Sequence, residues 1–236
     1  MGSSAHGDVV VDQGAFGIVL RRAPGYRGMD VFFTNLLDGM DARLRSHDSH
    51  IELLIVTTAE QELDALARWS ADGLVAAVVI ADLQESDPRP ALCRELGLPA
   101  VSLGTGSDGV MSGVVVDNGG AARLAVDFLV GAGHQRLARV SGPARLRHTK
   151  ERDSCFAEQA AGHAGVACSI LEGDYTTESG YDCTERLLGL DPRPTAILYD
   201  NDAMAVAGLE AAQDAGLEVP RDLSILAWDD SALSRL

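Results

Sequence analysis

Three polar residues lie where apolar runs give way to helical patterns, which is where side chains of α/β proteins meet small molecules. Arg152 lies in a predicted helix, and its guanidinium offers several fixed hydrogen-bond donors to vicinal oxygens. Asp229 ends an apolar run, so its carboxylate can accept hydrogen bonds from hydroxyl groups. Asn201 follows another apolar run, and either Asn201 or Asp202 is expected to cap the helix that begins there. Arg152 and Asp229 thus offer a donor and an acceptor for hydrogen bonds to a small molecule.

Two of these residues also have a purely structural alternative. Arg152 could pair with Glu151 or Glu158 on the surface of its own helix. Asp229 could instead cap a following helix, a role that Asp230 or Ser231 would serve equally well. Ligand binding is the favoured interpretation for both Arg152 and Asp229.

Four aromatic side chains lie at predicted strand-to-helix junctions or helix starts, in a chain with only 5% aromatic residues: Phe32, Phe33, Tyr175 and Trp228. Sugar rings present apolar CH faces, and these faces stack on aromatic rings in binding sites. Core packing is the alternative role. It is favoured for Trp228 and for one of the two phenylalanines, whereas both roles stay open for Tyr175.

Other motifs that could carry chemistry are weak. Gly104–Gly109 matches G-x-G-x-x-G, but the residues after it predict a strand, whereas a dinucleotide site needs a helix N-terminus there. His47 and His50 lie in a polar turn, and no further metal ligands are placed with them. The four cysteines show no C-x-x-C spacing, which indicates reduced, structural thiols. A nucleophile elbow is absent from the sequence. We therefore expect no enzyme activity, no cofactor and no metal.

Composition narrows the class of protein further. The 236 residues are 46% hydrophobic, and no apolar run reaches the roughly 20 residues that a membrane span needs. The formal net charge is −16, from 19 basic and 35 acidic side chains, and such a chain repels phosphate backbones. We expect that this chain by itself binds neither nucleic acid nor membrane. The first residues do not read as a signal peptide, so a cytoplasmic location is expected.

Short apolar runs alternate with amphipathic stretches, which predicts strands that alternate with helices. The predicted strands are Phe16–Leu20, Ile51–Val56, Val75–Ile80, Ala100–Leu103, Val114–Val116, Arg136–Val140, Ser169–Leu171, Thr195–Tyr199 and Ser224–Ala227. The predicted helices are Asp30–Arg45, Ala59–Ser70, Arg89–Leu96, Gly119–Val130, Lys150–Ala164, Glu178–Leu188 and Asp202–Ala215. Continuous apolar strands between helices indicate parallel sheets that are covered on both faces.

The alternation runs twice, so the sequence predicts an α/β fold with two doubly wound parallel-sheet subdomains. We assign residues 1–12 to a tag-like or disordered lead, 13–116 to the N-terminal subdomain and 117–236 to the C-terminal subdomain. Asp117 and Asn118 lie at the crossover, where hinge structure and the N-cap of the next helix are their expected roles. Since such sheets bind ligands at the carboxyl ends of their strands, we expect the ligand in an inter-subdomain cleft that closes by a hinge motion.

Two segments near the C-terminus carry a resemblance to a known family. Pro194–Ala205 reads PTAILYDNDAMA, and Ala215–Ser231 reads AGLEVPRDLSILAWDDS. Together they resemble the LacI/GalR family, whose members read P-T-A-I, N-D and M-A, then G-L-x-V-P-x-D-[VL]-S and an aromatic residue before Asp-Asp. Shorter matches lie upstream, at Asp30–Phe33, Val116–Ala121, Gly133–Arg136, Ser141–Pro143, Arg152–Phe156 and Gly173–Tyr181.

The resemblance implies a periplasmic-binding-protein-like fold of type I, as the effector-binding core of a transcriptional regulator that senses a small molecule, expected to be a sugar. It also implies a set of ligand-binding residues: Asp30, Phe32, Phe33, Arg152, Tyr175, Asn201, Trp228 and Asp229. Within this set, Arg152 would hold ligand hydroxyls or a carboxylate. Tyr175 would be the stacking platform, and Phe32 or Phe33 would close the other side.

The resemblance further implies a homodimer that recognises operator DNA. The DNA would be bound only through the family's N-terminal helix-turn-helix headpiece, to which no segment of this chain corresponds. A periplasmic sugar-binding protein of an ABC transporter shares this architecture and is the alternative function. The segments VPRDLS and AWDDS favour the regulator.

Overall fold

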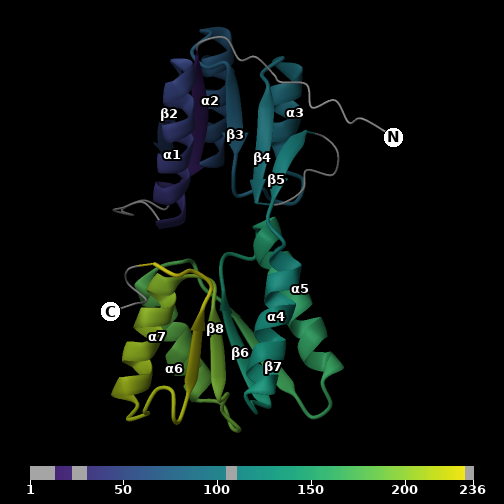
Figure 1. Cartoon of the computed structure of the whole chain (residues 1–236), viewed down its shortest axis with the longest axis vertical. Coiled ribbons are helices and arrows are strands. Elements are labelled where there is room, and N and C mark those ends of the chain that lie inside the picture. The colour runs from purple at the N-terminus through teal and green to yellow at the C-terminus, as the bar shows by residue number, and fades with distance from the viewer. Residues whose placement is uncertain (1–13, 23–30, 105–110, 232–236) are drawn as a thin grey trace. The chain divides into compact units, whose positions relative to one another are not determined.

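The structure, a computed structural model, describes residues 14–22, 31–104 and 111–231 (Figure 1). The chain divides into two compact units. The first comprises Met1–Ala81 and Ser86–Val115, and the second comprises Asp82–Glu85 and Val116–Leu236. The short segment Asp82–Glu85 thus belongs to the second unit although it interrupts the first in sequence. The sequence predicts the boundary between residues 116 and 117 and leaves Asp82–Glu85 in the N-terminal subdomain.

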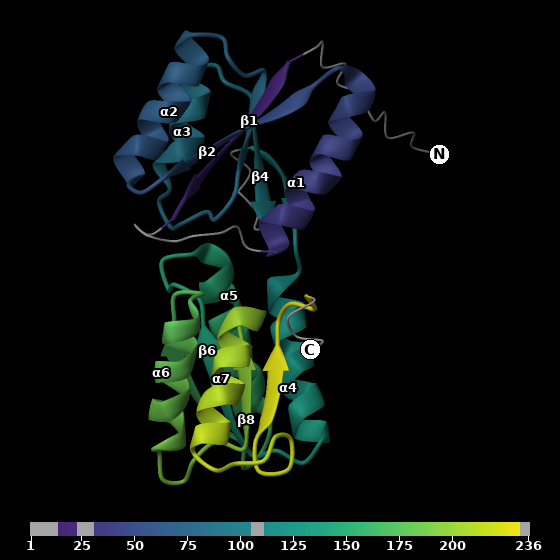
Figure 2. The same cartoon turned by 90° about the vertical axis from the view of Figure 1, so that its left-hand side faces the viewer.

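The first unit holds a parallel five-stranded sheet with strand order β2-β1-β3-β4-β5. Its strands are β1 (Ala15–Arg21), β2 (His50–Val56), β3 (Ala77–Ile80), β4 (Ala100–Gly104) and β5 (Ser112–Val115). Its helices are α1 (Val31–Leu44), the 3₁₀ helix η1 (Arg45–His47), α2 (Ala59–Ala71) and α3 (Pro88–Glu95). Helix α1 covers one face of the sheet, and α2 and α3 cover the other (Figure 2).

The second unit holds a parallel four-stranded sheet with strand order β7-β6-β8-β9. Its strands are β6 (Arg136–Ser141), β7 (Ala167–Glu172), β8 (Ala196–Tyr199) and β9 (Ser224–Ala227). Its helices are α4 (Asn118–Gly131), α5 (Arg147–Gly162), α6 (Thr177–Leu188) and α7 (Asp202–Asp214). Helices α4 and α5 lie on one side of this sheet, and α6 and α7 lie on the other (Figure 1).

The side chains of β6 and β8 alternate between two buried clusters because successive residues of a strand point to opposite faces. Ala138 and Val140 join the cluster that includes residues of α6 and α7. Leu137 joins the opposite cluster, with residues of α4 and α5, as do Ala196 and Leu198 of β8. This alternation places Arg139 on the α4 and α5 side of the sheet, although it is a charged residue with no exposed surface.

The predicted fold class, two parallel-sheet α/β subdomains, is confirmed. The described residues contain each predicted strand and helix. Strand β9 has the predicted bounds, the predicted helix start at Asp30 lies outside the described residues, and most other elements have shifted ends. Strand β3 begins at Ala77 and not at Val75, and β5 runs from Ser112 to Val115 and not to Val116. Helix α5 begins at Arg147, three residues before the predicted start, because the backbone N–H of Lys150 already bonds to Leu146 O. The 3₁₀ helix η1 was not predicted.

Four observations concern other classes of protein and site. Among the described residues, no helix is both long and apolar enough to cross a membrane. In the same part of the chain, no group of three or more His, Cys, Asp or Glu residues could hold a metal ion. The four cysteines are unpaired thiols: Cys93, Cys155, Cys168 and Cys183. The G-x-G-x-x-G motif lies outside the described residues except for Gly104, and strand β5 follows it at Ser112–Val115, as expected.

Candidate ligand-binding site

The strand order of the second sheet reverses between β6 and β8. From β6 the chain moves outward to β7, and from β8 it moves outward to β9 on the other side. At such a switch point the loops after the two central strands diverge, which leaves room for a ligand at the carboxyl edge. Gly142 directly follows β6 and Asp200 directly follows β8. The Gly142 N–H donates to Asp200 Oδ2 over 2.7 Å, so this carboxylate lies at the switch point.

The Asp200 carboxylate is fully buried and is shared by two arginines. Arg139 Nη2 donates to Asp200 Oδ1 over 2.6 Å, and Arg152 Nη1 donates to the same oxygen over 3.1 Å. Burial alone would raise the pKa of Asp200, but the charges of Arg139 and Arg152, with the Gly142 N–H, outweigh it and lower the pKa below its usual value. Asp200 is therefore ionised at neutral pH.

Arg152 is held in a single orientation by three groups. Its Nε donates to Asn118 Oδ1 over 2.9 Å, and its Nη1 contacts Asp200. The guanidinium carbon also lies 3.8 Å from the centroid of the Trp228 ring. The side chain is 11% exposed, and Nη2 forms no hydrogen bond with the described residues. Among the described residues, Arg152 thus pairs with Asp200 and not with Glu151 or Glu158.

Arg139 connects Asp200 to a second carboxylate, that of Asp153. Arg139, Arg152, Asp153 and Asp200 together form a charged cluster. Arg139 Nε donates to Asp153 Oδ1 over 2.7 Å, on helix α5. Burial, opposed by the Arg139 charge, raises the pKa of Asp153 above its usual value. Arg139 Nη1 is buried and is the one side-chain polar atom of this kind in the described residues that lacks a hydrogen-bond partner. Such an atom marks a place for an ordered water or a ligand group.

Tyr175 lies beside the cluster in a constrained conformation. Its backbone φ is +72°, which is unusual for a bulky residue, and Asn201 Nδ2 donates to its carbonyl oxygen over 3.0 Å. The ring packs against Gly142, where a Cβ atom would come within 2.2 Å of it. Its hydroxyl lies 2.9 Å from His148 Nε2. Burial, more than any neighbouring charge, raises the pKa of Tyr175 and lowers the pKa of His148.

Asn201 and Asp117 both cap helices. Asn201 Oδ1 accepts from the N–H of Met204 over 2.9 Å at the start of α7, and Asp117 Oδ1 accepts from the N–H of Gly120 over 2.8 Å at the start of α4. Asn118, expected to act at the crossover with Asp117, is buried and holds Arg152. The side chain of Asn118 therefore accepts a hydrogen bond from Arg152 of the charged cluster, in addition to any role at the crossover.

The structure brings four of the predicted ligand-binding residues together in the second unit. Arg152 and Trp228 are in contact, and Asn201 is bonded to Tyr175. Asp229 follows Trp228 and is partly exposed. The predicted residues Phe32 and Phe33 belong to the first unit, at the start of α1. Phe32 is 47% exposed and Phe33 is 5% exposed, in the core, with its ring edge-to-face on Phe32. Asp30 lies outside the described residues.

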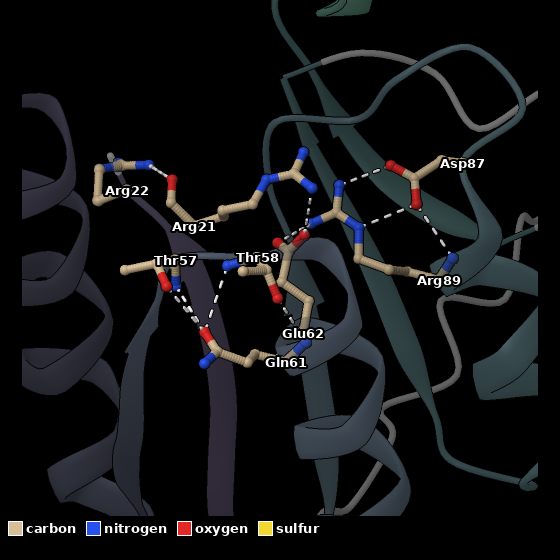
Figure 3. A network of polar contacts seen from close by, with 8 residues as sticks. All are labelled: Arg21, Arg22, Thr57, Thr58, Gln61, Glu62, Asp87 and Arg89. Carbon is tan, nitrogen blue, oxygen red and sulfur yellow. Dashed lines mark hydrogen bonds and ion pairs between the residues drawn. The ribbon is translucent and has the colours of Figure 1, made fainter. Parts of the chain in front are cut away.

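The first unit carries its own charged network at the carboxyl edge of its sheet (Figure 3). Arg89 forms a two-pronged pair with Asp87, through Nε–Oδ1 at 2.9 Å and Nη2–Oδ2 at 2.6 Å. Arg89 Nη1 also contacts Glu62 Oε1 at 3.2 Å, and the other oxygen of Glu62 lies 3.4 Å from Arg21 Nη1. Beside this network, Gln61 completes a capping box with Thr58 at the start of α2. The network links β1, α2 and α3.

Sequence reasoning missed Arg139, Asp153 and Asp200 in the second unit. A signal for Asp200 was available, because it follows an apolar strand directly and precedes Asn201 in the segment LYDND. No comparable local signal existed for Arg139, which interrupts the buried strand β6. Its partners Asp153 and Asp200 are 14 and 61 residues away in sequence.

Known proteins resemble this chain over most of its length. A family model described as periplasmic binding protein-like domain matches residues 126–236. The HTH-type transcriptional regulator AglR of Rhizobium meliloti is 31% identical over 221 residues, which are 92% of this chain and 61% of AglR. CelR of Thermobifida fusca is 31% identical over 179 residues, 73% of this chain and 52% of CelR. The chain thus spans about half to three fifths of these curated relatives.

The solved structures that resemble this chain are also transcriptional regulators. A LacI family transcriptional regulator from Bifidobacterium animalis subsp. lactis superposes with a TM-score of 0.83 at 34% identity, over 93% of this chain and 78% of that chain. A transcriptional regulator CelR–cellobiose complex superposes with a TM-score of 0.82 at 26% identity, over 94% of this chain and 70% of that chain. These relatives are transcriptional regulators and not enzymes. The chain belongs to the LacI family of transcriptional regulators.

Proposed function

We propose that this chain is the ligand-sensing part of a transcriptional regulator and that it binds a sugar at the carboxyl edge of the sheet in its second unit. Arg152 and Asn201 supply hydrogen-bonding groups, Tyr175 and Trp228 supply apolar rings, and Asp229 supplies a further acceptor. Binding changes the affinity of the whole protein for operator DNA, because the ligand prefers one of two conformational states.

The observation that carries this proposal is the arrangement of Arg152. Three groups fix the guanidinium, namely Asn118, Asp200 and the Trp228 ring, while Nη2 forms no hydrogen bond with the described residues. A preorganised planar donor beside an aromatic ring suits the vicinal hydroxyls and CH faces of a sugar. Little side-chain entropy then remains to be lost on binding.

A relative supports the choice of ligand class. The structure that superposes with a TM-score of 0.82 is a CelR–cellobiose complex, and cellobiose is a disaccharide. The conformation of Tyr175 supports the place of the site, because a strained residue often serves a functional site. We therefore place the sugar against the edge formed by the loops that follow β6 and β8.

The partners of the whole protein are part of the same proposal. The net charge of −16 disfavours DNA binding by this chain, so we assign the operator contact to another part of the full-length protein. That protein acts as a homodimer, as the family resemblance implies. Sedimentation of the full-length protein would give a dimer mass, and a monomer at micromolar concentration would contradict this part.

A thermal-shift screen tests the sensing function. The wild-type chain is screened against neutral mono- and disaccharides, with cellobiose included, and at least one should raise its melting temperature. Arg152→Ala should remove that rise because the fixed donor is lost. Arg186→Ala, an exposed arginine on α6 of the same unit, is the matched control and should keep the rise. No stabilising sugar for the wild type, or an undiminished rise in Arg152→Ala, would overturn the proposal.

A further inference from the structure

We propose that Asp200 makes this site selective for an uncharged ligand, so that the sensor accepts a neutral sugar and rejects sugar phosphates and sugar acids. This inference rests on the proposed function, because it assumes that the ligand meets Arg152. It assigns a role in ligand specificity to Asp200 and predicts that the ligand is uncharged, and the family resemblance implies neither.

The charges of the cluster compensate one another. Arg152 and Arg139 provide two positive charges, and Asp200 and Asp153 provide two carboxylates in direct contact with them. The side chain of Asp200 is fully buried and contacts both arginines. The positive charge of Arg152 is therefore already satisfied before a ligand arrives, although Nη2 still has hydrogen atoms to donate.

The surrounding charges do not restore a positive field. Lys150 of α5 pairs with Glu85, which lies in the segment Asp82–Glu85 of the second unit. Glu172, at the end of β7, accepts from the N–H of Ala144 over 2.7 Å. Asp82 is close enough to act on the pKa of Tyr175 and His148. Arg139, Arg152 and Lys150 thus each have a carboxylate in contact with them.

A ligand's charge decides how it meets this arrangement. A hydroxyl oxygen can accept from Arg152 Nη2 without any electrostatic penalty from Asp200. A phosphate or carboxylate at the same position would meet the like charge of Asp200 in a poorly hydrated setting, where such repulsion is weakly screened. Like-charge contacts and unmet charges are the usual way in which a site rejects the wrong ligand. Asp200 therefore selects by repulsion while it also positions Arg152.

Inorganic phosphate is the probe that isolates this effect. The melting temperature of the wild-type chain is measured in phosphate and in chloride at equal ionic strength, and the two should agree. Asp200→Asn removes the compensating charge, so phosphate should now raise the melting temperature by about 3 °C or more when present well above its Kd. Adding Arg152→Ala to this variant should cancel the rise. Asp182→Asn, an exposed acid on α6, removes the same charge elsewhere and should behave as wild type.

A second variant guards against misfolding of Asp200→Asn, which leaves a buried arginine without its partner. Arg139→Met combined with Asp153→Asn and Asp200→Ala removes the buried arginine together with both of its carboxylates, a change that proteins often tolerate, and leaves Arg152 as the uncompensated charge. It should gain the same phosphate response. The proposal is overturned if wild type itself gains a phosphate response that Arg152→Ala removes, or if neither variant gains one. The first of these results would leave the sensing function intact, whereas failure of the sugar screen would remove it.

Discussion

The guanidinium of Arg152 stacks on the indole ring of Trp228, with its carbon atom 3.8 Å from the ring centroid. Arg152 belongs to helix α5 and Trp228 follows strand β9, so the contact joins two distant parts of the second unit. The ring also packs against the buried cluster of α4, α5, β6 and β8. Trp228 therefore packs against the core, the role that the sequence favours for it, and also contacts Arg152 in the candidate site.

A double-mutant cycle should detect this stacking as a coupling energy. We expect Arg152→Met and Trp228→Leu to be coupled by about 0.5–2 kcal/mol in the free energy of unfolding, because a cation over an indole ring contributes that much when partly desolvated. Urea unfolding followed by circular dichroism gives the four values of the cycle. Arg152→Met paired with Trp69→Phe, in the core of the first unit, is the control and should show additive effects. Additivity for the Trp228 cycle as well would contradict the stacking.

Asn201 has two bonds whose contributions can be separated. Its Oδ1 caps helix α7 through the Met204 N–H, and its Nδ2 holds the Tyr175 carbonyl. Asn201→Ala loses both and should lower the free energy of unfolding by about 1–2 kcal/mol. Asn201→Ser keeps a capping oxygen but is too short to reach Tyr175, so it should lose less. Urea unfolding compares the three proteins. Equal losses in the two variants would show that the cap contributes nothing measurable.

The strands and helices could be predicted because the spacing of apolar residues in the sequence follows which side chains are buried. Buried parallel strands such as β8, with all four residues buried, read as unbroken apolar runs. Arg139 could not be predicted because it breaks that rule inside β6. A fully buried arginine becomes admissible only when Asp153 and Asp200 arrive from other elements, and sequence spacing does not reveal such a meeting.

The roles of the aromatic residues were predictable only in part. One of Phe32 and Phe33 was expected in the core, and helical geometry decides that it is Phe33, since adjacent residues on a helix face different directions. The backbone of Tyr175, at φ +72°, had no sequence signal, because glycine and asparagine are the residues that usually adopt this conformation. Contacts from Asn201 and Gly142 over-determine it, and these come from the loops after β8 and β6.

The charged network of the first unit should respond unequally to the loss of its two arginines. Arg89→Ala leaves the carboxylates of Asp87 and Glu62 poorly paired in a buried place and should lower the free energy of unfolding by about 3–5 kcal/mol. Arg21→Ala should cost about 1 kcal/mol or less, because Arg21 is 22% exposed and makes a single 3.4 Å contact. Urea unfolding measures both, and Arg89→Lys, which keeps the charge but not the planar fork, should fall between them. A larger loss for Arg21→Ala would contradict this ranking.

Cys93 should make the stability of the first unit fall at alkaline pH. The thiol is 2% exposed, and burial, opposed by the nearby Arg89 charge, raises its pKa to about 11. In the unfolded chain a cysteine has a pKa of about 8.5, so the folded state binds this proton more tightly. The resulting stabilisation is complete below about pH 8.5 and is lost as the pH rises through about 11. Urea unfolding of wild type and Cys93→Ala across this window should show the steeper decline for wild type. Parallel curves would mean that the thiol does not titrate differently in the folded and unfolded chains.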